Sequence, residues 1–376
     1  MKIEAIDTYR VGDRFLLVEI ATDNGLVGLG EAGLWGYPDA AEEVIEHCKT
    51  YLLGKNPLRI EHHYQFLYRN VHFRGAAISG ALGGIDIALW DIAGKHYQAP
   101  VWQLLGGKCR HRVRCFTPIG GDTPEEMADA AREAVDAGFK AVRVMPFPPG
   151  YAEMGHSEFI EVAVACVTAV REEVGPLVDI GVEIHRRLGP LGAVALAQEL
   201  APLRILFYED PLLPDSVQTK GQVAPQIPLP ITSGERLHTL FEFRELLETG
   251  ACKIIRPDVC LAGGLTQCKK IVGMAESHQV GIIPHNPLSP VCTAACVQLE
   301  ACIPNWVMHE YSGDDQAPRN RLLKRGLHFE DGYVMVPDAP GIGVELNHEA
   351  LDDFPAGLRP IEPNTPLRDD GSVADS

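Results

Sequence analysis

The sequence predicts an α/β fold, in which a parallel barrel of the TIM type follows an N-terminal α+β region. Two observations carry this prediction. From about residue 111 onward, eight short apolar segments alternate with helical patterns, and no Gly-rich phosphate-binding loop opens any of the helices. Such alternation gives parallel strands with right-handed crossovers, and eight of them favour closure into a barrel. A doubly wound nucleotide-binding sheet is the second choice.

The N-terminal region begins with a predicted antiparallel sheet. Its three strands are expected at residues 2–9, 14–22 and 26–31. The pair Asn24-Gly25, which lies between the last two apolar runs, is a strong hairpin signal. Helical patterns follow at residues 38–53, 60–70 and 79–97. This part of the chain is therefore expected to be α+β.

The barrel region begins with a strand and a helix that carries its own start and stop signals. Thr123 can cap the helix, Pro124 suits its first turn, Glu126 completes a capping box, and Gly138 ends it. The eight predicted strands lie at residues 112–118, 139–146, 177–183, 205–210, 230–235, 252–258, 280–285 and 306–310.

The composition predicts a cytoplasmic globular protein that binds neither nucleic acid nor a membrane. The chain has 376 residues and a formal net charge of -18, so polyanions would be repelled and an anionic small molecule would need a local positive site. No secretory signal pattern is present at the N-terminus, and no apolar run reaches about 18 residues. The ten cysteines lack metal-ligand spacing; Cys292 and Cys296, for example, fit one apolar helix face, so core packing is expected.

Ionisable residues recur at the ends of the later predicted strands, at intervals of 23 to 27 residues. They are Glu183, Glu209, Glu235, Asp258, His285 and Glu310. Each interval is close to one strand-helix unit, and the carboxyl ends of parallel barrel strands meet at one mouth, where barrel enzymes build their sites. Any one of these residues alone would be interpreted as a helix N-terminal acid or a solvated loop charge. The set of six favours a site.

Three of these carboxylates predict a metal site. Glu183, Glu209 and Glu235 would repel one another unless a cation neutralised them, and an all-oxygen set suits Mg²⁺, with Mn²⁺ as the next choice. His185 is two residues beyond Glu183, so strand alternation would point it into the same cavity, where it could act as a general acid. Arg186 and Arg187 are interpreted as ordinary surface or mouth charges.

At this point the sequence resembles the enolase superfamily, in its mandelate racemase subgroup, over nearly the whole chain. The resemblance rests on the motifs ALWDIAGK (88–95), PVWQLLGG (100–107), EDP (209–211), GER (234–236), PDVCLAGGLTQ (257–267), PHNPLSP (284–290) and GIGVE (341–345). It implies an α+β capping domain at residues 1–112, a (β/α)7β barrel at 113–330, and a C-terminal segment, 331–376, that returns to the capping domain. It also implies a homo-oligomer.

The resemblance implies roles for the six ionisable residues at the strand ends. Carboxylates on the third, fourth and fifth barrel strands bind Mg²⁺ in such families, which corresponds to the three glutamates named above. An Asp and a His on the next two strands form a dyad, which falls on Asp258 and His285, and a Glu closing the eighth strand, here Glu310, often binds the substrate carboxylate. His185 matches the extra histidine of the acid-sugar dehydratases, which are hydro-lyases. The likeness is greatest to those acting on D-galactonate, with those acting on D-mannonate next.

Two positions depart from that family pattern. The third-strand ligand is more usually Asp, and Glu183 is longer by one methylene. The racemases carry a K-x-K base on the second strand, whereas this chain has Arg143 in VRVMPF. Because a guanidinium cannot easily lose a proton, two-base racemisation would lack one partner.

These residues favour an acid-sugar dehydratase over three alternatives. His285, oriented by Asp258, would remove the α-proton of an aldonate, and His185 would protonate the departing β-hydroxyl, which leaves a 2-keto-3-deoxy acid. The alternatives are an epimerase or cycloisomerase of the same superfamily, a non-catalytic metal-binding member, and a protein with a decayed site. Expected substrate contacts are Trp35, Tyr37, the loop 72–77, Arg143 and His238.

Overall fold

An antiparallel sheet of three strands opens the chain in the computed structural model, which describes residues 1–70, 72–213, 215–360 and 367–374. The strands are β1 (Ile3–Val11), β2 (Phe15–Thr22) and β3 (Val27–Ala32), in the order β1-β2-β3. The predicted hairpin closes where Thr22 N donates to Leu26 O at 2.9 Å, and Gly25 takes the positive φ of +84° that the turn requires.

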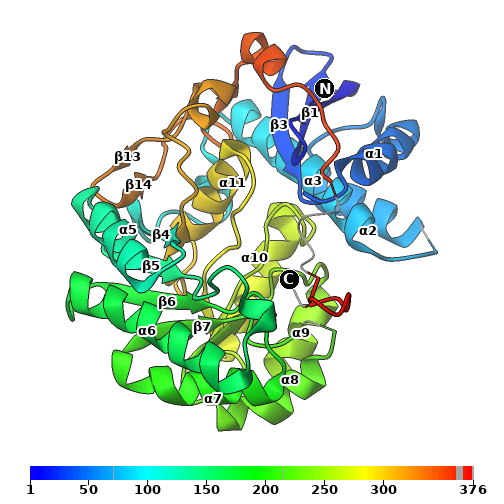
Figure 1. Ribbon diagram of the computed structural model, residues 1–376. Coiled ribbons are helices and arrows are strands. Elements are labelled where there is room, and N and C mark those ends of the chain that lie inside the picture. The colour runs from blue at the N-terminus through cyan, green and yellow to red at the C-terminus, as the bar shows by residue number, and fades with distance from the viewer. Residues whose placement is uncertain (71, 214, 361–366, 375–376) are drawn as a thin grey trace.

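Four helices follow this sheet. They are α1 (Pro38–Leu52), α2 (Ile60–Asn70), α3 (Ala76–His96) and the short α4 (Val101–Leu104). Among the helices of the described ranges, only α3 is long and apolar enough to cross a membrane. However, 78% of its most apolar window is buried inside the protein. It lies between the sheet and helix α10 (Gly264–Ser277), where Trp90 Nε1 donates to Thr266 Oγ1 at 2.8 Å (Figure 1). Its apolar character is therefore explained by burial.

Glycines bring β3 and α3 into backbone contact. A Cβ placed on Gly30 would lie 2.1 Å from the carbonyl oxygen of Gly84 and 2.9 Å from Ala88 N. Neither backbone atom can move without shifting the helix. The two elements can pack this closely only because Gly30 has no side chain.

We expect Gly30→Ala to destabilise the protein by about 1–3 kcal/mol or more, because the added methyl overpacks this contact. Denaturant unfolding measures the change. Gly273→Ala is the matched control, since its Cβ on α10 would meet nothing within 4 Å. That control should be neutral or stabilising by up to about 1 kcal/mol. Equal stabilities for the two variants would contradict the packing described here.

A closed parallel barrel follows the N-terminal part, and the predicted fold class is confirmed. Its strands are β4 (Arg112–Ile119), β5 (Ala141–Val144), β6 (Asp179–Glu183), β7 (Ile205–Glu209), β8 (Ile231–Ser233), β9 (Ile254–Ile255), β10 (Gly281–Ile282) and β11 (His309–Glu310). Consecutive strands pair in parallel from β4 to β10. The barrel closes through a parallel bridge between Ile282 and Trp306 and through the pairing of β11 with β4.

Helices separate the barrel strands and surround them (Figure 1). They are α5 (Pro124–Asp136), α6 (His156–Val174), α7 (Pro190–Leu200), α8 (Val217–Val223), α9 (Leu240–Glu248), α10 and α11 (Pro290–Ala301). Thr123 caps α5 as expected, by accepting from Glu126 N at 3.2 Å. The predicted capping box is wrong in one detail, because the Glu126 carboxylate accepts from Asp122 N at 2.7 Å rather than from the cap residue.

Side chains fill the barrel interior, so the site lies at the mouth and not in a channel. A layer of buried residues from six strands or strand ends packs there: Phe116, Ala141, Phe207, Ile254, Ile283 and Met308. Gly181 makes room for this layer, because a Cβ at that position would lie 2.1 Å from the Phe207 ring.

The C-terminal segment touches both parts of the molecule. Two hairpin strands, β13 (Phe329–Glu330) and β14 (Tyr333–Met335), extend the barrel sheet beside β4. Further strands are β12 (Leu323–Arg325) and β15 (Glu345–Leu346), which pair with each other. The GIGVE motif then meets the N-terminal part, since the buried carboxylate of Asp91 accepts from Ile342 N at 2.8 Å and from Leu29 N at 2.9 Å. The boundaries at residues 112 and 330 stay predictions.

Candidate active site

Three glutamates converge at the carboxyl ends of neighbouring strands. Glu183 and Glu209 are the last residues of β6 and β7 and face each other in register, and Glu235 comes two residues after β8. One carboxylate oxygen from each lies within 4.8 Å of the other two, and all three side chains are buried. The structure therefore brings together the three residues that the sequence predicts as metal ligands; we call them the carboxylate cluster.

Arginine side chains surround the carboxylate cluster. Arg143 Nη1 lies 3.3 Å from Glu183, 3.4 Å from Glu209 and 2.9 Å from Glu310. The fully buried Arg256 pairs with Glu209 and with Glu310. Arg143 is thus enclosed among carboxylates. It does not line the cavity described below, so its predicted contact with a substrate stays a prediction.

Negative charge exceeds positive charge around the carboxylate cluster. Burial, followed by the nearby charge of Glu209, raises the pKa of Glu183 well above its usual value. Burial alone would raise the pKa of Glu235 also, but His285 and Arg186 lower it. A buried set of three carboxylates, one of which resists ionisation, fits a divalent cation bound through oxygen. Such an ion would share Glu183 and Glu209 with the guanidinium of Arg143.

The predicted dyad is formed. Asp258 Oδ2 lies 3.0 Å from His285 Nδ1, while Asp258 Oδ1 accepts from the backbone of Cys260 at 2.9 Å and of Leu261 at 3.0 Å. These bonds hold the carboxylate in one orientation. His285 Nε2 lies 3.6 Å from Glu235. Burial alone would lower the pKa of His285, but Glu235 and Asp258 raise it to about 9.

The backbone turns immediately after Glu183, which changes how His185 is positioned. Strand β6 ends at Glu183, and His185 and Arg186 adopt positive φ angles of 52° and 67°. The strand alternation expected through His185 is therefore absent. Arg186 lines the cavity and pairs with Glu235, and its Nη2 lies 3.0 Å from the His185 ring. Arg186 is thus a charge at the barrel mouth, and it connects His185 to the carboxylate cluster, a role that the sequence did not predict.

The environment of His185 favours the neutral ring. Burial and the positive charge of Arg186 lower the pKa of His185 to about 4. Its backbone N–H donates to Glu183 at 2.7 Å, which fixes the turn against the carboxylate cluster. His185 thus lies beside the predicted metal ligands, as expected, but without the proton that an acid would donate.

Glu310 closes the ring of strand ends without lining the cavity. It ends β11, and its carboxylate is bound by Arg256, by Arg143 and by Asn286 N at 2.9 Å. Burial alone would raise the pKa of Glu310, but the two arginines lower it to about 2. The contacts of Glu310 are thus with protein groups, and a role in binding the substrate carboxylate stays a prediction.

A cavity of about 570 Å³ lies over His285 and Glu235. Its lining residues are Gly33, Leu34, Trp35, Gly36, Tyr37, Ala76, Arg186, Glu235, Arg236, His238, Asp258, Leu261, His285, Arg359 and Pro360. Loops of the N-terminal part, barrel strand ends and the C-terminal segment all contribute. Three predicted substrate contacts, Trp35, Tyr37 and His238, are present. Of the predicted loop 72–77, Ala76 reaches the cavity, and residue 71 before it lies outside the described residues.

The sequence did not predict a role at this site for Arg256, Arg236 or Arg359. Arg256 lies two residues before Asp258, and strand alternation could have placed both on the inner face. Arg236 directly follows Glu235, a predicted metal ligand, and lines the cavity. Arg359 stacks on Trp35, with its guanidinium carbon 4.6 Å from the ring centre. No local pattern signals Arg359, because its role depends on the path of the C-terminal segment.

Comparisons with known proteins agree with this architecture. Residues 5–106 match the family described as Mandelate racemase / muconate lactonizing enzyme, N-terminal domain, and residues 126–350 match Enolase C-terminal domain-like. The chain is 36% identical to a D-galactonate dehydratase of Verminephrobacter eiseniae, over 100% of both chains. It is 38% identical to a D-galactonate dehydratase of Pectobacterium atrosepticum, over 93% of this chain and 94% of that one. An enolase structure from Agrobacterium radiobacter, with bound Na and L-malate, superimposes with a TM-score of 0.93 at 28% identity over 100% of both chains.

Proposed function

Because the chain belongs to the mandelate racemase / muconate lactonizing enzyme family of the enolase superfamily, we propose that it is an acid-sugar dehydratase that converts an aldonate such as D-galactonate into a 2-keto-3-deoxy acid. The observation that carries the proposal is the His285–Asp258 pair, which lines the cavity beside the carboxylate cluster. A base in that position can reach the α-carbon of an acid whose carboxylate is bound at the cluster.

His285 removes the α-proton in this proposal. With Nδ1–H donated to Asp258, Nε2 is the basic nitrogen, and it lies on the side of Glu235. The negative charge of Glu235 raises the pKa of this ring, and a cation held at the carboxylate cluster would offset that charge and leave Nε2 free to accept a proton. Asp258 keeps the ring in that tautomer and orientation, because its other oxygen is fixed by two backbone N–H groups. The geometry matches the requirement of a general base that is held by a second group.

The carboxylate cluster would hold Mg²⁺ through Glu183, Glu209 and Glu235. Mn²⁺ could take the place of Mg²⁺. A divalent ion bound there stabilises the negative charge that develops on the substrate carboxylate as the α-proton leaves. Glu183 supplies the same oxygen donor as the more usual Asp. The contact of its carboxylate with His185 N shows that the longer side chain still reaches the turn at the barrel mouth.

Cations on the cavity wall support an anionic substrate. Arg186, Arg236 and Arg359 all line the cavity of a protein whose overall charge is -18. Together with a cation held at the carboxylate cluster, these arginines would attract an anion to this opening although the overall charge of the protein repels it. Trp35 adds an apolar face between Arg14 and Arg359, whose guanidinium carbons lie 5.2 Å and 4.6 Å from the ring centre.

A screen of aldonates and aldarates with the Mg²⁺-loaded protein tests the proposed function. Semicarbazide traps 2-keto products, and the expected result is keto-acid formation from D-galactonate or a close stereoisomer. D-Mannonate is the comparator that differs in hydroxyl configuration. A panel in which every acid sugar is returned unchanged would contradict the proposal.

We expect His185→Asn to lower kcat for dehydration by about 10²-fold or more, because His185 protonates the departing hydroxyl. This role requires a proton on the ring, which an anionic substrate beside it favours. Exchange of the α-proton with solvent should survive in the variant, since His285 is intact. The measurements are the kcat for keto-acid release and NMR of the α-position. Unchanged dehydration by this variant would show that the role assigned to His185 is wrong.

A further inference from the structure

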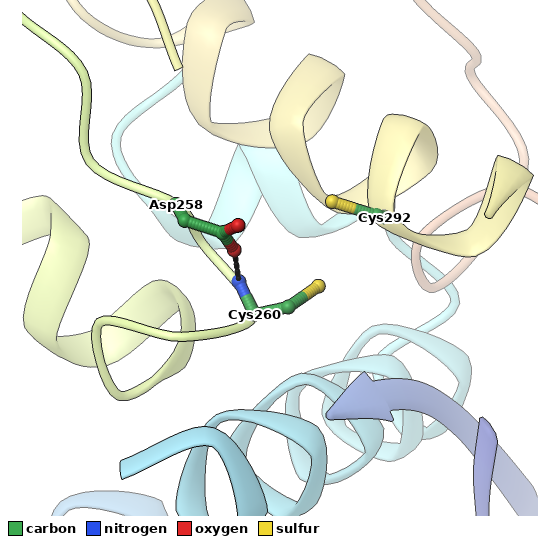
Figure 2. A group of neighbouring side chains, drawn as sticks. All are labelled: Asp258, Cys260 and Cys292. Atoms are coloured by element: carbon green, nitrogen blue, oxygen red, sulfur yellow. Dashed lines mark hydrogen bonds between the residues drawn. The ribbon is translucent and has the colours of Figure 1, made fainter. Parts of the chain in front are cut away.

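A second group of possible ligand atoms lies behind the dyad. Asp258 and Cys260 belong to the turn between β9 and α10, and Cys292 lies in the first turn of α11 (Figure 2). One oxygen of Asp258 and the two sulfur atoms lie within 4.8 Å of one another, and all three side chains are buried. We call these three residues the thiol cluster. The proposed reaction uses only the carboxylate.

Cys292 differs from an ordinary packing cysteine. It lies in the first turn of α11, after the cap residue Ser289, and its backbone N–H donates to the buried carboxylate of Glu31 at 3.0 Å. Hydrogen bonds from the thiols of Cys260 and Cys296 lower the pKa of Cys292, whereas burial raises the pKa of Cys260. Cys296 Sγ lies 4.0 Å from Cys292 Sγ, so a third sulfur atom stands next to the thiol cluster.

We propose that the thiol cluster is a second cation site, which takes a thiophilic divalent ion such as Zn²⁺ or Cd²⁺ through Cys260, Cys292 and Asp258. Thiolates select such ions over Mg²⁺, which prefers oxygen. Tetrahedral zinc with sulfur at about 2.3 Å needs ligand atoms about 3.8 Å apart, so separations within 4.8 Å require a movement of no more than about 1 Å. Binding releases the two thiol protons and leaves the carboxylate ionised.

The thiol cluster lies directly under the active-site cavity. Asp258 and Leu261 line that cavity, and a Cβ on Gly33 would lie 2.9 Å from Cys260 Cβ. An ion bound to Asp258 competes with His285 Nδ1 for the carboxylate, so it should inactivate the base. This inhibitory effect rests on the proposed function, whereas binding of the ion does not.

Binding is tested by titrating the reduced protein with Cd²⁺ in the presence of saturating Mg²⁺, which occupies the carboxylate cluster. Thiolate-to-cadmium charge-transfer absorption reports the ligands directly. We expect one equivalent with high affinity, lost in Cys260→Ala and in Cys292→Ala. Cys109→Ala, at the exposed cysteine, and Cys48→Ala, at a buried one in α1, are the controls that keep the signal. An absorption that disappears only in the Cys109 variant would overturn the site.

Inhibition is tested with Zn²⁺ at the same Mg²⁺ concentration. The rate of the unaltered protein should fall by about tenfold or more, slowly because the ligands are buried, and a chelator should restore it. Cys292→Ala should keep its basal activity, since Cys292 hydrogen-bonds to Glu31 and Cys296 and has no part in the proposed reaction, and should resist Zn²⁺. Equal inhibition of this variant would show that Zn²⁺ acts at the carboxylate cluster. If the protein dehydrates no acid sugar, the absorption titration still decides whether the thiol cluster binds an ion.

Discussion

His285→Asn should lower kcat for acid-sugar dehydration by about 10²–10⁴-fold, the usual contribution of a general base. Asparagine can still pair with Asp258 but cannot accept the α-proton. Steady-state assay of keto-acid formation measures the loss. Exchange of the α-proton in D₂O should disappear together with dehydration, because both require the base.

The matched control is His238→Asn, which changes another histidine on the same cavity wall. His238 lies 3.6 Å from Glu242 and has no contact with the dyad. Its replacement should alter KM more than kcat. If His285→Asn retained more than a tenth of the activity, or if both variants lost the same amount, His285 would not be the base.

Glu183→Gln should remove most Mg²⁺ binding and lower kcat by on the order of 10²–10³-fold, because the ion supplies several kcal/mol of charge stabilisation. Calorimetric Mg²⁺ titration of the chelator-treated protein and the keto-acid assay measure the two effects. Excess Mg²⁺ should restore part of the activity if weakened binding is the cause.

The free energy of unfolding distinguishes a loss of Mg²⁺ binding in Glu183→Gln from a folding defect. Burial and Glu209 disfavour the ionised form of Glu183, so removing its charge should leave the metal-free protein at least as stable in denaturant unfolding. Glu199→Gln is the control, because that carboxylate is exposed on α7. An active Glu183→Gln protein with unchanged Mg²⁺ affinity would contradict the assignment of the carboxylate cluster.

The meeting of ionisable residues at the strand ends could be predicted from the sequence because it depends only on topology. Once strands and helices alternate, residues such as Glu183 and Glu209 at successive strand ends must share one mouth. The pairing of Asp258 with His285 follows for the same reason, since the two residues form a bridge between adjacent strand ends.

Other features depend on details that a periodic pattern does not contain. The positive φ angles at His185 and Arg186 turn the chain out of the strand. Histidine is found more often than most residues at such angles, but no glycine stands at either position to mark the turn in the sequence. Arg359 reaches the cavity because the C-terminal segment returns across the barrel mouth. The thiol cluster joins residues 32 positions apart on two elements, so the spacing of the cysteines gave no sign of it.

The central claim, loss of an α-proton followed by loss of the β-hydroxyl, is tested most directly by NMR of the Mg²⁺-loaded protein with D-galactonate, or the best substrate of the screen, in D₂O. The result we expect is a 2-keto-3-deoxy acid that carries deuterium at C3, because the enol left by dehydration takes its proton from solvent. Deuterium at the α-carbon of unconsumed substrate with no keto acid would contradict the claim and indicate an epimerase or cycloisomerase. Tight binding with neither change would indicate a non-catalytic protein.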